Sequence, residues 1–424
     1  MTTTLSTLEQ RALDALDPEG AVELLTDMLV IPSTPGSDAE CDIQHLLAER
    51  MRQLDLDVDL WPLDLPALTA APGFPGIEAQ RSQAWGLVAT SPGFSEPPAL
   101  IVQGHVDVVP PGDLARWPSA PFRPRFAAGR IHARGACDMK AGMAANLAAV
   151  AAIRKAGLRT RRPFAVHSVI GEEDGGLGAF ATLQRGHTGA ACIITEPTSG
   201  TLITANAGAL TFTLRVPGLA THGCTAYAGS SAITSYLAIH EALAELETAR
   251  NITVEPLMRE YPVAYPISIG RVRAGDWASS VPDLLVAEGR MGVRIEEDPA
   301  SAMVELEETV AKASARDPYL RGVPATVSWS GGQFAGGQLP AEHPLRERVA
   351  EAHCDATGSP RPRERGAPYG SDLRLYAAEG IPTLHYGPGE VRLAHSPDES
   401  VEVSEVLDVA RVLTLSLLRE CGAS

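Results

Sequence analysis

The chain lacks long apolar runs, a basic leading segment and an excess of positive charge, and each absence excludes a class of protein. Its longest apolar stretches fall well short of the ~20 residues that a membrane-spanning helix needs. Residues 1–16 contain no basic segment followed by an apolar core, so we expect no secretory signal. Lys and Arg number 35 against 52 Asp and Glu, and the formal net charge of −17 disfavours binding to nucleic acids or to anionic membranes.

Cysteines are few and scattered. The six of them lie far apart, and no CxxC pair occurs. This pattern indicates reduced thiols rather than a disulfide framework or a cysteine–zinc site, and we therefore expect a cytoplasmic protein. At about 150 residues per domain, the 424 residues predict two to three domains.

Four short apolar runs, each flanked by Gly or Pro, predict strands that are covered on both faces of a sheet. They are residues 99–103, 164–170, 190–195 and 382–386. Between the first two, residues 139–156 have helical spacing of apolar side chains and end at Gly157. Helices are also predicted at 18–29 and 39–54, and an irregular loop at 61–82 because of its Pro and Gly. These patterns predict an α/β fold.

The middle of the chain predicts a different arrangement, in the order β-α-β-β-α-β that is typical of a ferredoxin-like domain. The segments are 210–216, 231–246, 266–273, 285–295, 299–315 and 325–329. Because the last α/β strand follows them, we expect a discontinuous catalytic domain, 1–207 and 331–424, with a smaller domain inserted at 208–330.

Polar residues gather where the predicted α/β strands end, which is the edge of such a sheet where ligands bind. They are His105, Asp107, Asp138, Glu172, Glu173, Glu196 and His395. Imidazoles and carboxylates suit two divalent ions, with Zn²⁺ expected first and Co²⁺ or Mn²⁺ as alternatives. Each residue alone also has a structural explanation. Asp138 could be no more than the N-cap of a helix, and Glu172 and Glu173 could form a solvated turn.

Six motifs, five of them around these residues, resemble those of the M20 metallopeptidases, which include acetylornithine deacetylase and succinyl-diaminopimelate desuccinylase. They are GHVDVVP (104–110), RGACDMKAG (134–142), GEEDGG (171–176), TEPT (195–198), THG (221–223) and AHSPDE (394–399). The resemblance implies an α/β zinc-hydrolase domain and an inserted lid and dimerisation domain, and hence a homodimer.

The resemblance also implies individual roles. The implied ligands are His105, Asp138 and Glu196 for one ion and Asp138, Glu173 and His395 for the other. Asp107 would orient the first histidine, Glu172 would be the general base, and the Asp138–Met139 peptide bond would be cis.

In the inserted domain, His222 resembles a histidine that stabilises the oxyanion, and Arg294 resembles an arginine that binds a substrate carboxylate. Arg374 matches another substrate-side position more loosely. Many family members carry Asn shortly before a Val-Pro pair, where this chain has Ser279 and Ser280. The exact substrate therefore stays open.

The predicted function is a metal-dependent amidohydrolase that removes an acyl group from a small N-acyl amino acid or related amide. Water bridging the two metals would be activated by Glu172. The alternative within the family is a dipeptidase or carboxypeptidase, and an alternative of another class is a catalytically inactive binding or scaffold protein. The expected partner is a small-molecule substrate, with neither nucleic acid nor membrane involved.

Overall fold

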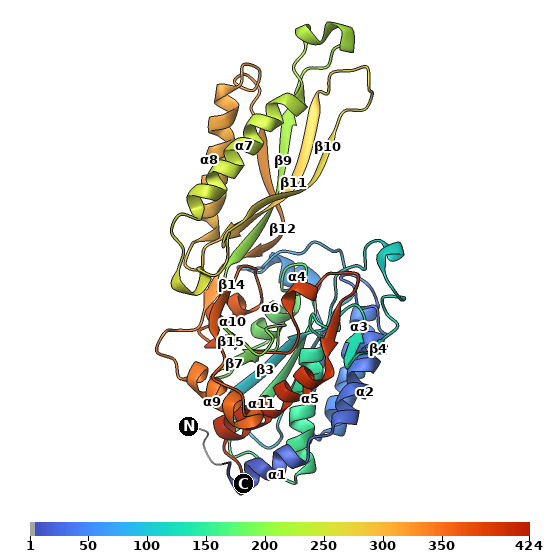
Figure 1. The fold of residues 1–424 in the computed structure, drawn as a ribbon, viewed down its shortest axis with the longest axis vertical. Helices are drawn as coiled ribbons and strands as arrows, with labels where there is room; N and C mark the ends of the chain where they lie inside the picture. Colours follow the sequence, from blue (N-terminus) through green and yellow to red (C-terminus); the bar gives the residue numbers. More distant parts are fainter. Residues whose placement is uncertain (1–4) are drawn as a thin grey trace. The chain divides into compact units, whose positions relative to one another are not determined.

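The computed structural model describes residues 5–424, which form two compact units. Unit 1 consists of the described part of Met1–Thr204 with Gln338–Arg365 and Asp372–Ser424, and unit 2 of Ala205–Gly337 with Gly366–Ser371. Both units combine helices and strands, which confirms the predicted α/β class (Figure 1). Within residues 5–424, no helix has the length and apolar character needed to cross a membrane.

The larger sheet has nine strands and forms the centre of unit 1. Its order is β1-β2-β6-β3-β7-β15-β8-β13, and β14 pairs with β8. The four strands expected from the apolar runs are β3 (Leu100–His105), β6 (Phe164–Val169), β7 (Cys192–Ile194) and β15 (Thr383–His385). They lie next to one another and run parallel, so their carboxyl ends share one edge. The flanking strands are β1 (Asp57–Pro62), β2 (Trp85–Thr90), β8 (Leu202–Asn206), β13 (Gly337–Gln338) and β14 (Glu364–Ala367).

Helices cover both faces of this sheet, which explains why its strands are apolar without interruption. Along β3, Leu100 and Val102 enter the core on one face, whereas Ile101 enters the core on the other. The first core is built with α1 (Thr7–Asp14), α2 (Pro18–Leu29), α3 (Ala39–Gln53), α5 (Lys140–Lys155), α9 (Leu345–Thr357) and α11 (Val403–Cys421), and the second with α6 (Leu177–Gln184) and α10 (Leu373–Ala378). Figure 1 shows α5 beside α2 and α11.

Residues 61–82 are not irregular throughout, and that prediction was wrong for part of the segment. It contains the end of β1 and the helix α4 (Leu65–Ala70), which begins after Asp64 with Pro66 in its first turn. Proline has no backbone N–H, but the N–H groups of the first helical turn have no partner within the helix. Proline is therefore well tolerated at the start of a helix, although it disrupts the interior.

A separate three-stranded sheet, in the order β16-β5-β4, joins segments far apart in sequence. Its strands are β4 (Arg125–Ala127), β5 (Arg130–His132) and β16 (Ser400–Glu402). Ser400 pairs with His132, so the residues that follow β5 lie beside those that precede β16.

Unit 2 contains the predicted β-α-β-β-α-β order. The elements are β9 (Gly208–Pro217), α7 (Ala232–Arg250), β10 (Ile267–Ala274), β11 (Leu284–Val293), α8 (Pro299–Arg316) and β12 (Thr326–Phe334). The strands form an antiparallel sheet in the order β10-β11-β9-β12, and both helices pack against its apolar face. The short segment Gly366–Ser371 also clusters with this unit, because Gly366 lies against Met258 and Gly370 against Phe334.

Candidate metal centre and active site

His105 ends β3 and is 1% exposed. Its Nδ1 donates to the backbone oxygen of Asp107 at 3.0 Å, and its Nε2 lies 3.1 Å from Asp138 Oδ1 and 3.8 Å from Glu196 Oε1. A carbonyl oxygen only accepts hydrogen bonds, so the proton of a neutral ring is on Nδ1. The lone pair of Nε2 then points at the carboxylates, as a metal ligand requires.

Asp138 lies just before α5, and its peptide bond to Met139 is cis, as the motif resemblance implies. Glu399 holds this turn, because its Oε1 accepts the N–H groups of Cys137 at 2.9 Å and of Asp138 at 3.0 Å. Its other oxygen pairs with Arg134 Nη1 at 2.5 Å.

Arg134 extends the same network to the last motif. Its Nη2 donates to the backbone oxygen of His395 at 3.3 Å, while its Nη1 holds Glu399. Both charged side chains are almost completely buried. We predicted no function for Arg134 or Glu399, although each lies inside a recognised motif. Their adjacency depends on the pairing of β5 with β16, which no local pattern reveals.

Glu172 and Glu173 form a turn after β6. Their N–H groups donate to the carboxylate of Asp107, Glu172 N to Oδ1 at 3.3 Å and Glu173 N to Oδ2 at 3.1 Å. The same carboxylate lies 3.6 Å from His105 Nδ1, farther than the backbone oxygen that the ring contacts. Asp107 therefore positions the glutamate turn as well as the imidazole.

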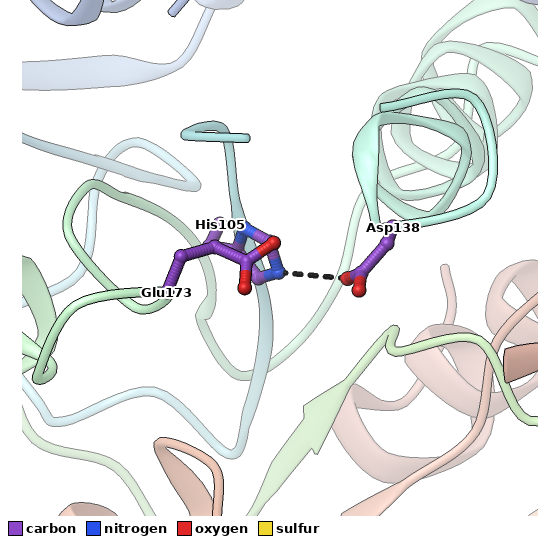
Figure 2. A group of neighbouring side chains, drawn as sticks. All are labelled: His105, Asp138 and Glu173. Carbon is purple, nitrogen blue, oxygen red and sulfur yellow. Dashed lines mark hydrogen bonds and ion pairs between the residues drawn. The ribbon is translucent and has the colours of Figure 1, made fainter. Parts of the chain in front are cut away.

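The predicted metal ligands and base of unit 1 come together from five segments. His395 Nε2 lies 3.1 Å from Glu173 Oε2 and 3.4 Å from Asp138 Oδ2. Figure 2 shows the neighbouring side chains of His105, Asp138 and Glu173, with a dashed line between His105 and Asp138. Ligand atoms of these three residues lie within 4.8 Å of one another, as do those of a second group formed by His105, Glu172 and Glu196.

The electrostatics of the cluster are those of crowded, buried carboxylates. Burial and the charge of Glu196 raise the pKa of Glu172 well above its usual range. Burial, reinforced by Asp138, raises the pKa of Glu196 to about 8. Hydrogen bonds that the His395 ring donates to the carboxylates of Asp138 and Glu173 raise the pKa of His395 to about 11. Protons are thus held where negative charge accumulates.

This donor set fits a pair of divalent cations. Imidazole nitrogens and carboxylate oxygens are ligands of Zn²⁺, Co²⁺ and Mn²⁺. Cations among the carboxylates would also replace the protons that the cluster otherwise retains. A buried group of acids with two histidines is costly without such compensation.

Two other predicted residues belong to unit 2. His222 is exposed before a short 3₁₀ helix (Gly223–Ala228), and its Nδ1 accepts the N–H of Cys224 at 3.1 Å. Arg294 follows β11, and its Nη2 donates to the backbone oxygen of Arg250 at 3.0 Å. Their roles toward the carboxylate cluster stay predictions.

Arg374 lies in unit 1 and is 5% exposed. Its Nη2 donates to the backbone oxygen of Gly175 at 2.6 Å, within the segment that carries Glu172 and Glu173. The guanidinium thus contacts the glutamate turn itself, and its role in binding a substrate carboxylate stays a prediction.

Comparisons with known proteins agree with the motifs. A model of peptidase family M20/M25/M40 matches residues 101–419. The chain is 26% identical over 422 residues to N-formyl-4-amino-5-aminomethyl-2-methylpyrimidine deformylase of Halalkalibacterium halodurans, covering 94% of this chain and 93% of that protein. It is 28% identical over 416 residues to succinyl-diaminopimelate desuccinylase of Alkalilimnicola ehrlichii, covering 95% and 99%.

Solved structures share the fold. A dipeptidase from Saccharomyces cerevisiae has a TM-score of 0.74 at 14% identity, with 99% of both chains covered. A Bacillus subtilis protein described as a dinuclear metal-binding peptidase of family M20 has a TM-score of 0.62 at 15% identity, covering 95% of this chain and 98% of that one. The family resemblance of the motifs is confirmed, because the matching model spans most of the sequence. The chain belongs to peptidase family M20/M25/M40 and is a hydrolase of amide bonds.

Proposed function

We propose that this hydrolase is a two-metal deacylase that releases an amine from a small N-acyl amino acid or related amide. The observation that supports it most is the convergence of His105, Asp138 and Glu173 with Glu172 and Glu196 at one edge of the sheet. Such a cluster offers both a metal site and a free acid–base group.

The proposed ligand sets are those that the motif resemblance implies, and they divide the residues differently from the two groups of neighbouring side chains. His105, Asp138 and Glu196 would hold one ion, and Asp138, Glu173 and His395 the other, with the aspartate shared. Zn²⁺ is the first expectation, and Co²⁺ or Mn²⁺ would suit the same donors. When bound, such ions polarise an amide carbonyl and lower the pKa of water.

Glu172 would move the proton. One carboxylate oxygen takes a proton from the water whose oxygen bonds to the carbonyl carbon, and later delivers it to the departing amine nitrogen as the C–N bond breaks. Burial raises the pKa of Glu172, which suits a group that must both accept and return a proton near neutrality. Asp107 supports this step by holding the turn through the N–H groups of Glu172 and Glu173.

His222 would stabilise the oxyanion. Because its Nδ1 accepts the N–H of Cys224, the proton of the neutral ring is on Nε2, which is therefore a donor. A donor aimed at the developing negative charge is what hydrolysis of an amide needs. Arg294 and Arg374 would bind a carboxylate of the substrate.

The relatives favour a deacylase but leave the acyl group open, since one is named a deformylase and another a desuccinylase. A peptidase is the second candidate, because a probable carboxypeptidase of Aspergillus niger is 27% identical over 427 residues. An inactive relative that acts by binding alone is the third. We further propose a homodimer located in the cytoplasm, where the six free cysteines would stay reduced.

A substrate screen tests these alternatives. Metal-loaded protein is assayed with N-formyl, N-acetyl and N-succinyl amino acids and with dipeptides, beside the Glu172→Gln variant. Turnover of an N-acyl amino acid that is lost in the variant supports the deacylase. Preference for dipeptides would favour the peptidase, and bound metal without turnover of any amide would favour a binding protein.

A further inference from the structure

The irregular segment that follows α4 packs directly against the turn that carries Glu172. The N–H groups of Glu78 and Ala79 donate to Asp174 Oδ2 at 3.2 Å and 2.9 Å. A Cβ added to Gly175 would lie 2.1 Å from the backbone oxygen of Gly76, so the two backbones touch. The position of the turn is therefore coupled to this segment.

Arg81 joins the segment and the turn through a buried ion pair. Its Nη2 and Nη1 donate to Asp174 Oδ1 at 2.8 Å and Oδ2 at 2.9 Å. Its Nε and Nη2 donate to Glu40 Oε2 at 2.9 Å and Oε1 at 3.0 Å. The guanidinium thus makes two bidentate contacts, which fix direction as well as distance.

All three charged side chains are buried. Those of Arg81 and Glu40 are 1% exposed and that of Asp174 is 5% exposed. Glu40 lies on α3, and its Oε2 also accepts the N–H of Gly36 at 2.7 Å. The arginine therefore ties the glutamate turn to a helix of the main core.

On its other side the turn is held by Asp107 and by Arg374, which donates to the backbone oxygen of Gly175 at 2.6 Å. Glu172 N reaches Asp107 at 3.3 Å, which is long for a hydrogen bond. A Cβ added to Gly171 would lie 3.0 Å from Arg81 Nη2, so the guanidinium sits directly against the residue before Glu172. A displacement of the base by 1 Å would slow the reaction by about 10²-fold.

We propose that Arg81 is a positioning residue for Glu172. Its two bidentate contacts, with Asp174 in the turn and Glu40 on α3, fix the position of the base relative to the proposed metal ligands. The inference rests on the proposed function of Glu172. A purely structural role would affect the amount of folded protein but leave the turnover of each folded, metal-loaded molecule unchanged.

Arg81→Lys is the test variant, because a lysine keeps the buried positive charge but cannot form the two planar contacts. In the full metal-loaded chain, we expect kcat to fall about 10- to 100-fold, KM to stay within about 2-fold, and metal content to be unchanged. Arg419→Lys is the matched control. Arg419 also bridges two carboxylates, Glu9 at 2.7 Å and Asp355 at 2.9 Å, but it contacts none of the proposed site residues.

A second variant keeps the test decisive if Arg81→Lys does not fold. Glu40→Gln retains the Arg81–Asp174 pair and loses one anchor, so we expect kcat to fall about 3- to 10-fold, less than for the lysine variant. Folded, metal-loaded Arg81→Lys or Glu40→Gln protein with wild-type kcat would overturn the proposal. So would an equal loss of kcat in Arg419→Lys.

Hydrogen exchange separates this inference from the proposed function. We expect the peptide that contains Glu172 and Glu173 to exchange about 10-fold faster in Arg81→Lys, because the N–H bonds to Asp107 open more often. This readout holds even if the wild type hydrolyses no amide, a result that would refute the proposed function alone. Unchanged exchange in a folded variant would refute the positioning role.

Discussion

At the scale of single residues, the site depends on what separates two adjacent glutamates. Glu173 contacts His395 through both carboxylate oxygens, at 3.2 Å and 3.1 Å, whereas Glu172 groups with His105 and Glu196. This difference fits a ligand role for Glu173 and a base role for Glu172. In a regular strand, two adjacent side chains point to opposite faces and could not both reach one site.

Replacing Glu172 by Gln removes the proton acceptor and keeps the size of the side chain. We expect two metals per chain and a kcat lower by about 10²- to 10⁴-fold, the usual contribution of a general base. The measurement pairs steady-state kinetics with metal analysis of the same sample. Glu19→Gln on the exposed start of α2 is the control and should leave both quantities unchanged.

Replacing His105 by Ala tests the ligand assignment. We expect the variant to keep one metal per chain and lose the other, because the first site loses its only imidazole. Metal analysis after dialysis against a weak chelator measures the ratio. Retention of two ions would show that His105 is not a ligand.

At the scale of elements, the small sheet of β4, β5 and β16 helps to position two of the proposed metal ligands. It places Arg134 beside Glu399, and this pair holds the backbone of Asp138 and of His395. Two proposed ligands from distant motifs thus depend on one buried ion pair.

For Glu399→Gln we expect metal affinity to fall about 10- to 100-fold, as is typical when a group that orients ligands is lost. Activity should return at high metal concentration, which metal titration of the variant measures. Glu402→Gln is the control. Glu402, at the end of β16, pairs with Arg130 of β5 at 2.8 Å but is 48% exposed, so its loss should change little. Equal effects of both substitutions would contradict the assigned role.

Sequence patterns predict elements well where periodicity is strong and poorly where contacts are distant. The apolar runs predict β3, β6, β7 and β15, and the Ala-rich stretch predicts α5, because these elements are buried in a regular way. The contacts of Arg81 with Glu40 and Asp174, which hold the glutamate turn, cannot be predicted from local sequence patterns. Arg81 lies in irregular backbone, and its partners Glu40 and Asp174 are 41 and 93 residues away.

At the scale of the whole molecule, stability depends on histidines buried without charge. His167 lies in the middle of β6, fully buried, with its Nδ1 2.8 Å from the Tyr376 hydroxyl. Burial, assisted by His187, lowers the pKa of His167 to about 3. The unfolded chain therefore binds a proton more readily, and this contribution to stability is lost as the pH falls below about 6.5.

We predict that the advantage of the wild type over His167→Gln in free energy of unfolding shrinks by about 2 kcal/mol between pH 7.5 and pH 5. Urea unfolding of the metal-free proteins at both pH values measures it. Tyr376→Phe should keep the pH dependence, because burial rather than the hydroxyl lowers the pKa. A difference that is independent of pH would contradict the prediction.

For the whole molecule, the motifs predict the family, the fold class and part of the site. The family and the fold class follow from motifs in order, and the structure brings the seven polar residues predicted at the sheet edge into one neighbourhood. His222 and Arg294 lie in unit 2, so what they contact during catalysis depends on the arrangement of the units and on substrate. Neither is encoded in local spacing.

The most direct test of a two-metal centre is a titration of metal-free protein with Zn²⁺, Co²⁺ or Mn²⁺, following amide hydrolysis and bound metal together. We predict that one of these ions restores turnover and that binding saturates at two ions per chain. Turnover that persists in fully metal-free protein, or folded protein that binds none of the three ions, would contradict the account.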